Sequence, residues 1–392
     1  MHIPSERVYN EMRSTSASIW YVPAIGDNNL AFLVKAPSSA LKAMIEGCPF
    51  QLFFGKENEI LCIGIKIVDI PDSPLFISTA QVVAEEQSAL FKCILEGKFP
   101  IFLFNEMDAC VAWSEAELEA NDCAELHKFI GAKTKLYNGQ INDDVLHILD
   151  CFEYTVDKER TYHNAHDIST LEIVPKITSW TSNKLYYYGE QNFQKIMIND
   201  SKEGKNFENT IWSSLTSVFP STLFKSPKVK KGNNVRELTD IFAYWEQGVF
   251  IIEAKDLSVS QAGYQLKQSK RISNLQKQVE KAIKQLIGAA KAFSRGDTIY
   301  DSNGKEISVS REIPPHCIIL ITEFINSKDW DTLQHQMNDA MKKTGALFHL
   351  LDFRELIIIL KQSSGKPDLF DLNLIERCKV CYENKLIFVR GK

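Results

Sequence analysis

Two acidic residues and one lysine in the second half of the chain have the types and spacing that metal-dependent hydrolysis requires. Glu253 and Lys255 stand two positions apart in the apolar run FIIEAK, and Asp240 stands 13 residues before Glu253. Side chains two apart on a strand point to the same face. Charged groups are rarely placed among apolar residues without a role. The pattern therefore predicts a functional site.

A hairpin would bring these three side chains together. Residues 237–257 predict two strands with a turn at 246–248, which sets Asp240 opposite residues 253–255. Two convergent carboxylates repel each other, and a divalent cation relieves that repulsion. Oxygen ligands with room for water favour Mg²⁺, for which Mn²⁺ can substitute. Lys255 would then orient or deprotonate a water, or stabilise negative charge on phosphorus.

The segments around the hairpin alternate between helices and strands. Helical spacing predicts helices at 205–219, 271–294, 328–343 and 354–362, and apolar runs predict strands at 221–231, 316–325 and 345–353. The resulting order is helix, three strands, helix, strand, helix, strand, helix. Such an order predicts a mixed α/β sheet with helices on both faces.

With these residues and this element order, the chain resembles the PD-(D/E)XK superfamily of nucleases, the restriction-endonuclease-like fold, over about residues 200–362. The resemblance rests on Asp240 and on Glu253-Ala254-Lys255. It implies that Asp240, Glu253 and the backbone carbonyl of Ala254 hold the metal. It also implies that Lys255 acts on the attacking water.

The same resemblance implies accessory residues on the flanking helices. Glu208, in KNFENTIW, stands where these nucleases often carry a further acidic residue facing the metal. RecB-like members carry a glutamine after the hairpin, and Gln278 suits that place better than Gln285 by its distance from Lys255. Thr239 replaces the proline of the motif's name, as in many members. The implied activity is that of a Mg²⁺-dependent endonuclease hydrolysing the phosphodiester bonds of DNA.

Two alternatives remain open for this segment. One is a surface hairpin in which Asp240 and Glu253 each form a salt bridge with Lys255 and have no catalytic role. The other is a binding module with the same fold and weak or lost catalysis, which would hold a nucleic acid or a protein. The apolar neighbours and the element order favour the nuclease over the salt-bridge hairpin.

Charge is spread unevenly along the chain. The total is 45 basic and 50 acidic residues, but residues 1–180 hold 14 and 26 of these, and the remainder hold 31 and 24. The basic second half suits a polyanion such as DNA. Basic residues flank the hairpin in sequence and could contact phosphates: Lys225, Lys228, Lys230, Lys231 and Arg236 before it, and Lys267, Lys270 and Arg271 after it. Tyr264, in the following loop, offers a ring for base stacking.

The acidic first half predicts a separate α+β domain at 1–155, followed by a junction at 156–203 and the nuclease domain with a C-terminal extension at 204–392. Strands are expected at 17–36, 51–70 and 100–113, and helices at 38–46, 79–97 and 114–131. A sensing or regulatory role, or binding of a regulatory protein, suits its charge. The layout looks like that of modular bacterial anti-phage or restriction-type defence enzymes. Double-strand cutting by one site per chain would suggest a homo-oligomer.

A second group of metal-ligand types occurs in TYHNAHD. His163, His166 and Asp167 could hold a metal as in phosphohydrolases that resemble HD proteins, with His127 or His147 as a further ligand. The stretch lacks helical periodicity, and Asp167 is as readily a turn residue. This site is therefore the weaker expectation.

The remaining patterns exclude several classes. Nine cysteines, mostly in apolar runs, predict buried reduced thiols, and Cys378 and Cys381 form a single CxxC without the second ligand pair that structural zinc normally needs. The sequence has no run of 18 apolar residues, so no membrane span is expected. The charged start argues against a signal peptide, so a cytoplasmic protein is expected. Walker A, GxGxxG and GxSxG patterns are lacking, so no ATP or dinucleotide site is expected.

Overall fold

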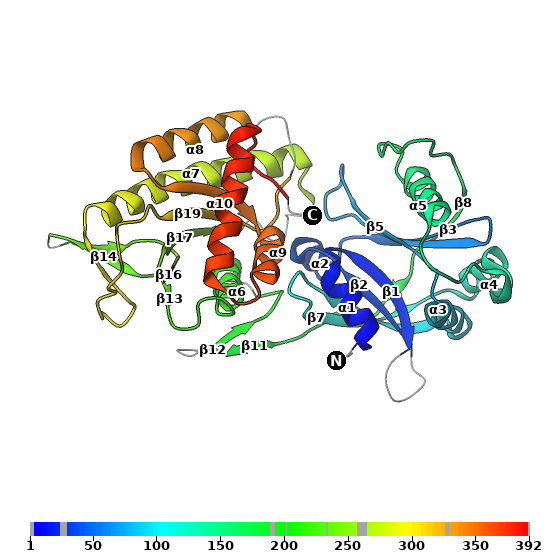
Figure 1. The fold of residues 1–392 in the computed structure, drawn as a ribbon. Coiled ribbons are helices and arrows are strands. Elements are labelled where there is room, and N and C mark those ends of the chain that lie inside the picture. The colour runs from blue at the N-terminus through cyan, green and yellow to red at the C-terminus, as the bar shows by residue number, and fades with distance from the viewer. Residues whose placement is uncertain are drawn as a thin grey trace. The chain divides into compact units, whose positions relative to one another are not determined.

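The chain divides into two compact units, Met1–Asn183 with Val259–Leu266, and Lys184–Ser258 with Lys267–Lys392. The computed structural model describes residues 4–23, 30–188, 193–200, 202–232, 234–256, 265–325 and 330–390 (Figure 1). Tyr264 lies outside these residues, as does the side chain of Lys231. Within the described residues, no helix is both long enough and apolar enough to cross a membrane.

The first unit has two sheets with helices packed on them, which confirms the expected α+β class. One sheet has the order β1-β2-β6-β7-β10, with β9 also paired to β7, and the other has the order β5-β4-β3-β8. The strands are β1 (Ser18–Pro23), β2 (Leu30–Lys35), β3 (Phe50–Glu57), β4 (Ile60–Ile67), β5 (Leu75–Ala80), β6 (Lys98–Phe104), β7 (Cys110–Glu117), β8 (Ser169–Ile173), β9 (Lys176–Ile177) and β10 (Thr181–Ser182). The helices are α1 (Glu6–Ser14), α2 (Ser38–Ile45), α3 (Ala84–Glu96), α4 (Ala120–Ile130) and α5 (Asp143–Val156).

Some local expectations for this unit were wrong. The acidic helix begins at Ala120 and not after Ser114, because Ser114 and Ala116 are alternate buried positions of β7. The stretch expected as an irregular junction contributes β8, which pairs with β3, and β9 and β10, which pair with β7. Helices α1 and α5 are additional to those expected.

Helix α5 lies directly on the backbone of the second sheet. A Cβ atom added to Gly55 on β3 would overlap the Phe152 ring of α5. At Gly64 on β4 it would overlap Phe76 and would lie 3.2 Å from Phe152 Cε1. The two glycines therefore allow a close approach that places α5 against the sheet, and Phe76 and Phe152 meet edge to face there at 5.7 Å.

The second unit is built on a five-stranded mixed sheet with the order β13-β16-β17-β19-β20. Strands β13, β16 and β17 are antiparallel, and β17, β19 and β20 are parallel, which confirms the mixed α/β class. The strands of this unit are β11 (Leu185–Tyr188), β12 (Phe193–Ile196), β13 (Leu223–Lys225), β14 (Lys228–Lys231), β15 (Asn234–Glu237), β16 (Ile241–Trp245), β17 (Gly248–Lys255), β18 (Thr298–Tyr300), β19 (His316–Ile321) and β20 (Leu347–Asp352). Its helices are α6 (Glu203–Leu215), α7 (Gln268–Ser294), α8 (Asp331–Thr344), α9 (Phe353–Ser363) and α10 (Pro367–Glu383).

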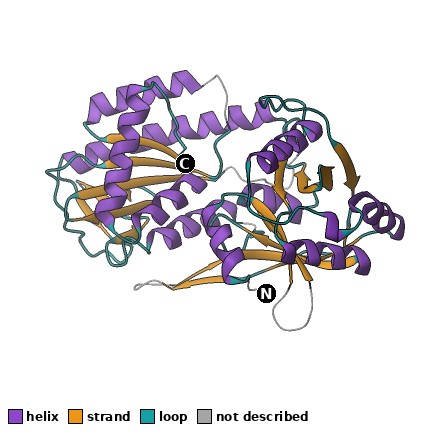
Figure 2. Cartoon of the chain, turned by 45° about the vertical axis from the view of Figure 1, so that its right-hand side comes forward, coloured by secondary structure: helices purple, strands orange, loops and turns teal. Residues whose placement is uncertain are grey.

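Helices cover both faces of this sheet (Figures 1 and 2). On one face, α7 and α8 bury an apolar core with the sheet, to which Ile251 and Ile319 contribute. On the other face, α6, α9 and α10 contact the strands, and the rings of Phe219, Phe250 and Phe370 meet at 5.1 to 5.6 Å. The central strands are therefore apolar on both sides, as the run FII in the hairpin predicts.

One strand of the expected order is divided. The run predicted at 221–231 breaks between β13 and β14, where Ser226 has a φ of 47° and Pro227 follows. Strand β13 joins the main sheet, whereas β14 joins a three-stranded sheet of order β15-β14-β18. The chain therefore turns away from the main sheet just before the hairpin.

Two buried histidines stack on neighbouring strands of the second unit. His316 on β19 and His349 on β20 have ring centroids 5.1 Å apart, and His316 Nδ1 lies 3.0 Å from His349 Nε2. His316 Nε2 lies 2.8 Å from Asp371 Oδ1 on α10. Burial lowers the pKa of His349 well below its ordinary value, and His316 and Arg377 lower it further. The His349 ring is therefore neutral in the folded protein at neutral pH.

Acidification is expected to destabilise the protein through His349. The unfolded imidazole binds a proton near pH 6.5 and the folded one only at lower pH, so stability is lost as pH falls below about 6.5, by up to about 1.4 kcal/mol per pH unit. Urea denaturation at pH 7.5 and 5.5 measures this slope. His349→Gln should flatten it, whereas His335→Gln, at an exposed position on α8, should not. Equal slopes in wild type and His349→Gln would contradict the assignment.

Candidate active site

The hairpin expected from the sequence forms with its turn at residues 246–247. Strands β16 and β17 pair with Trp245 opposite Gly248 and Ile241 opposite Ile252. Asp240, just before β16, therefore lies beside the Glu253 position on β17. The hairpin prediction is confirmed, because the alternation of apolar residues and the short turn both follow from local sequence.

The three charged side chains converge at the end of this hairpin. Lys255 Nζ lies 2.7 Å from Glu253 Oε2 and 3.8 Å from Asp240 Oδ2. The backbone N–H of Ala254 donates to Asp240 Oδ2 at 2.8 Å. Thr239, in the place of the motif's proline, donates its hydroxyl to the carbonyl oxygen of Ile252 at 2.6 Å. The Ala254 hydrogen bond holds Asp240 directly, and the Thr239 hydrogen bond holds the preceding residue against β17.

Glu253 is the deepest of the three, with 2% of its surface exposed. Burial, together with the charge on Asp240, raises the pKa of Glu253 to about 7, although Lys255 acts in the opposite direction. The ion pairs of Lys255 with Asp240 and Glu253, which the salt-bridge alternative predicts, are both present. However, a surface hairpin would leave Glu253 in water with an ordinary pKa. Here the carboxyl group is buried, although burial disfavours its charged form.

Glu208 on α6 joins the same region. Its carboxylate is half-buried, and burial together with the charge on Asp240 raises its pKa. Lys225 Nζ, from the end of β13, lies 3.7 Å from Glu208 Oε2 and also donates to Asn209 Oδ1. Burial lowers the pKa of Lys225. The structure thus brings the predicted Glu208 toward Asp240, with Lys225 as its counter-ion.

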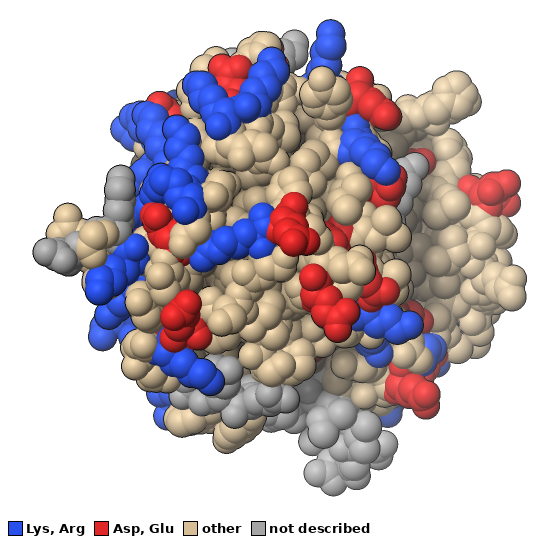
Figure 3. Space-filling model, turned by 60° about the vertical axis from the view of Figure 1, so that its left-hand side comes forward, with Lys and Arg blue, Asp and Glu red and all other residues tan. Residues whose placement is uncertain are grey.

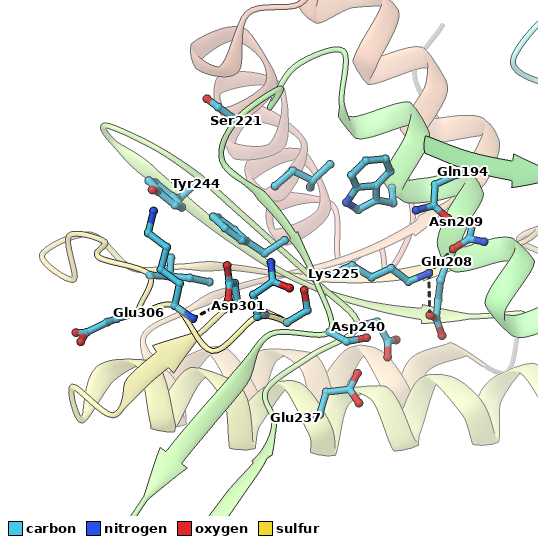
Figure 4. A pocket seen from close by; sticks show the side chains of 18 of the residues that line it. Gln194, Glu208, Asn209, Ser221, Lys225, Glu237, Asp240, Tyr244, Asp301 and Glu306 are labelled. Carbon is cyan, nitrogen blue, oxygen red and sulfur yellow. Dashed lines mark hydrogen bonds and ion pairs between the residues drawn. The ribbon is translucent and has the colours of Figure 1, made fainter. Parts of the chain in front are cut away.

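A large polar cleft is lined by Glu208, Lys225 and Asp240, whereas Glu253, Ala254 and Lys255 are not among its lining residues. It has a volume of about 1310 Å³. Figure 4 shows the side chains of Glu208, Asp240 and Glu237 at one end of it, whereas Asp301 and Glu306 lie toward the other. The lining residues are Gln194, Lys205, Glu208, Asn209, Trp212, Ser221, Leu223, Phe224, Lys225, Ser226, Glu237, Asp240, Tyr244, Asp301, Ser302, Asn303, Lys305, Glu306, Ile307 and Ser308. A cleft with carboxylates at one end has the donor chemistry that Mg²⁺ takes from proteins.

The other expected site residues lie apart from this cleft. Gln278, like Gln285, is exposed on α7 and is not among the residues lining the cleft. Lys228 and Lys230 are exposed on one face of β14, with Val229 buried on the other, and Arg236 is exposed on β15. These expectations rest on sequence proximity alone, which does not determine where a side chain points.

The basic residues after the hairpin lie at the start of the long helix. Lys267 is at the N-cap position of α7, Lys270 is exposed in its first turn, and Arg271 is half-buried there. Figure 3 shows one face of the molecule on which lysine and arginine side chains are interspersed with acidic ones. Phosphate contacts by these residues stay a prediction.

Two polar lining residues near Glu208 and Asp240 were missing from the expected site, and a third was expected in another role. Asn209 follows Glu208 on α6, Glu237 stands three residues before Asp240, and Lys225 was expected only as a phosphate contact. Asn209 could have been predicted from its position next to Glu208 on the helix before the sheet. The role of Lys225 depends on β13 crossing α6, which no local pattern shows.

The histidine cluster differs from the expected one. Asp167 is exposed and pairs with Lys158, and His163 is exposed in the same loop. His166 instead lies with His147 and Cys151. Among the described residues, the expected metal site with His163 and Asp167 does not form, because both side chains point to solvent. Cys378 and Cys381 are half-buried on α10 and belong to no group of three metal-ligand side chains in this part of the chain.

No family model, curated protein or solved structure matches this chain. The case for a function therefore rests on the geometry of the chain itself.

Proposed function

We propose that the chain is a Mg²⁺-dependent nuclease that hydrolyses phosphodiester bonds of DNA, as an effector of a bacterial anti-phage or restriction-type defence. The observation that carries the proposal is the convergence of Asp240 and buried Glu253 on Lys255 beside a polar cleft. The mixed sheet and the helix before it agree with the nuclease superfamily that the sequence resembles. The first unit would then bind a regulatory protein or restrain the nuclease.

Each residue has a defined task in this proposal. Asp240, Glu253 and the carbonyl of Ala254 would hold the metal, and Glu208 would assist directly or through water. Mg²⁺, when bound, supplies positive charge that lowers the pKa of a water and stabilises charge on the phosphate. Lys255 contacts Glu253 through Oε2, so a metal ion bound at that same oxygen would displace the ammonium. The ammonium of Lys255 is then available to hold the attacking water.

A binding module with the same fold is the second candidate. It is favoured by the two ion pairs that Lys255 forms with Asp240 and Glu253 in the absence of metal. It is also favoured by the mixed charge of the face in Figure 3. Titration calorimetry with Mg²⁺ separates the candidates. A nuclease should bind Mg²⁺ at a site that Asp240→Asn removes, whereas a module without catalysis should show no such site.

Plasmid DNA incubated with the purified protein tests the proposal. Nicking or linearisation is expected with Mg²⁺ and not with EDTA. Asp240→Asn should slow it about 10²-fold, since the amide keeps one oxygen ligand and loses the charge. Glu306→Gln, which removes a carboxylate at the far end of the same cleft, is the matched control and should cut as wild type does. Equal rates for Asp240→Asn and wild type would refute the site.

A further inference from the structure

A separate cluster of metal-ligand side chains lies in the first unit. His147 and Cys151 stand four residues apart on α5 and so share one face of the helix. His166 reaches the same place from the loop before β8. One ligand atom from each of the three residues lies within 4.8 Å of the others. We propose that these three side chains form a Zn²⁺ site, which is independent of the proposed nuclease.

The two sulfur-to-nitrogen distances fit a tetrahedral zinc ion. Cys151 Sγ lies 3.7 Å from His147 Nε2 and 3.4 Å from His166 Nδ1. A Zn–S bond of about 2.3 Å and a Zn–N bond of about 2.1 Å, at a tetrahedral angle, place sulfur and nitrogen about 3.6 Å apart. The two measured separations lie on either side of that value. A ligand set of one sulfur and two imidazole nitrogens also binds Zn²⁺ in preference to Mg²⁺.

A neighbouring carboxylate prepares His166 for this role. Glu57 Oε2, on β3, lies 2.9 Å from His166 Nε2. A carboxylate at Nε2 holds the proton on that nitrogen and leaves the lone pair of Nδ1 directed at Cys151 Sγ. The backbone N–H of His166 also donates to Cys151 Sγ at 3.4 Å. This arrangement is the outer shell that histidine ligands of metals normally have.

The site is held in place without the metal. The Phe152 ring packs on the backbone at Gly55 and thereby positions α5. The loop is anchored at its end, where the Ile168 N–H donates to Thr155 Oγ1 at 3.0 Å, and in its middle, where Arg160 donates to the Phe76 carbonyl at 3.1 Å. Pre-organised ligands lose little conformational entropy on binding, which favours a stable complex.

The same three groups would otherwise suit a cysteine nucleophile with its base. Cys151 is fully buried in the middle of α5, whereas reactive thiols lie in partly exposed, electropositive surroundings. The side chain of His166 is 50% exposed, so solvent can reach the metal position from that side. A water at the fourth position completes the coordination. The structure thus favours a metal over a covalent intermediate at this place.

Metal content and cobalt substitution test the site in the full-length chain. Protein from zinc-supplemented culture should contain about one Zn²⁺ per chain by elemental analysis. Metal-free protein titrated with Co²⁺ should develop a sulfur-to-cobalt charge-transfer band. Cys151→Ser should lose the band, while Cys93→Ser, a buried thiol on α3, and Cys378→Ser should keep it. The oxygen ligands proposed at the cleft give no such band, so the two metal sites are distinguishable.

Variants at less buried positions protect the test against misfolding. His166→Gln should abolish the band with an unchanged circular dichroism spectrum, and His163→Gln, in the same loop and also exposed, should leave it unchanged. Glu57→Gln should weaken Co²⁺ binding about 10- to 100-fold without removing the band. A wild type without zinc and without the band would overturn the proposal, as would a band that persists in both Cys151→Ser and His166→Gln.

Discussion

Replacing Lys255 by methionine is expected to slow Mg²⁺-dependent DNA cleavage about 10³-fold, a loss within the range for removing a general acid or base. Methionine keeps the apolar stem but removes the ammonium that lies 2.7 Å from Glu253 Oε2. Initial rates of plasmid nicking at saturating Mg²⁺ measure this loss. Mg²⁺ should still bind, because Asp240 and Glu253 are retained. Unchanged Mg²⁺ binding in titration calorimetry would show that the variant loses the catalytic step and not the metal.

Two further lysine variants make this result specific. Lys305→Met removes an exposed ammonium from the cleft that Asp240 lines and should leave cleavage close to the wild-type rate. Lys255→Arg keeps the charge that pairs with both carboxylates, so its fold should be intact, but guanidinium cannot release a proton to serve as a base. Wild-type cleavage by Lys255→Met, with its fold shown intact by circular dichroism, would exclude a catalytic role for Lys255.

Much of the second unit could be predicted from local patterns. The hairpin follows from the alternation in FIIEAK and a short turn, and α7 follows from an apolar stripe through Leu275, Val279 and Leu286. What could not be predicted is how far Glu253 is buried, since that depends on α7 covering one face of the sheet. The division of 221–231 into two strands likewise depends on Ser226 adopting a positive φ, which serine rarely does.

One contact between distant segments, the one that supports His166, escaped prediction. Glu57 and His166 are 109 residues apart in the chain and meet only because β8 pairs with β3. The expected His163 and Asp167 are closer in sequence to His166, but the loop turns both toward solvent. Spacing along the chain identifies ligands on one element, as for His147 and Cys151 on α5. It does not identify ligands that the sheet topology brings together.

The raised pKa of Glu253 has a consequence for stability in the absence of metal. The carboxyl titrates near pH 4.5 when unfolded and near pH 7 when folded. The folded state therefore binds the extra proton between these values, so the contribution of Glu253 to stability is lost as pH rises from 4.5 through 7. At pH 8 the cost of ionising the buried group is on the order of 1–3 kcal/mol.

Glu253→Gln is therefore expected to stabilise the metal-free protein at pH 8, by an amount on that order, and to have a much smaller effect at pH 5. The same variant should lose Mg²⁺ binding and slow cleavage about 10³-fold, since the most buried anionic ligand is gone. Urea denaturation in EDTA at both pH values measures the stability, and calorimetry measures the binding. Glu246→Gln, in the exposed turn of the same hairpin, should change neither.

Gain of stability together with loss of function distinguishes a functional carboxylate from a structural one. If Glu253 served only to pair with Lys255, its neutral isostere would leave a buried ammonium without its closest partner and would destabilise the protein at pH 8. If Glu253 is instead held for a metal, removing its charge relieves repulsion from Asp240 and burial of an anion. The sign of the change at pH 8 therefore shows whether burial and repulsion from Asp240 outweigh the pairing with Lys255 in the metal-free protein.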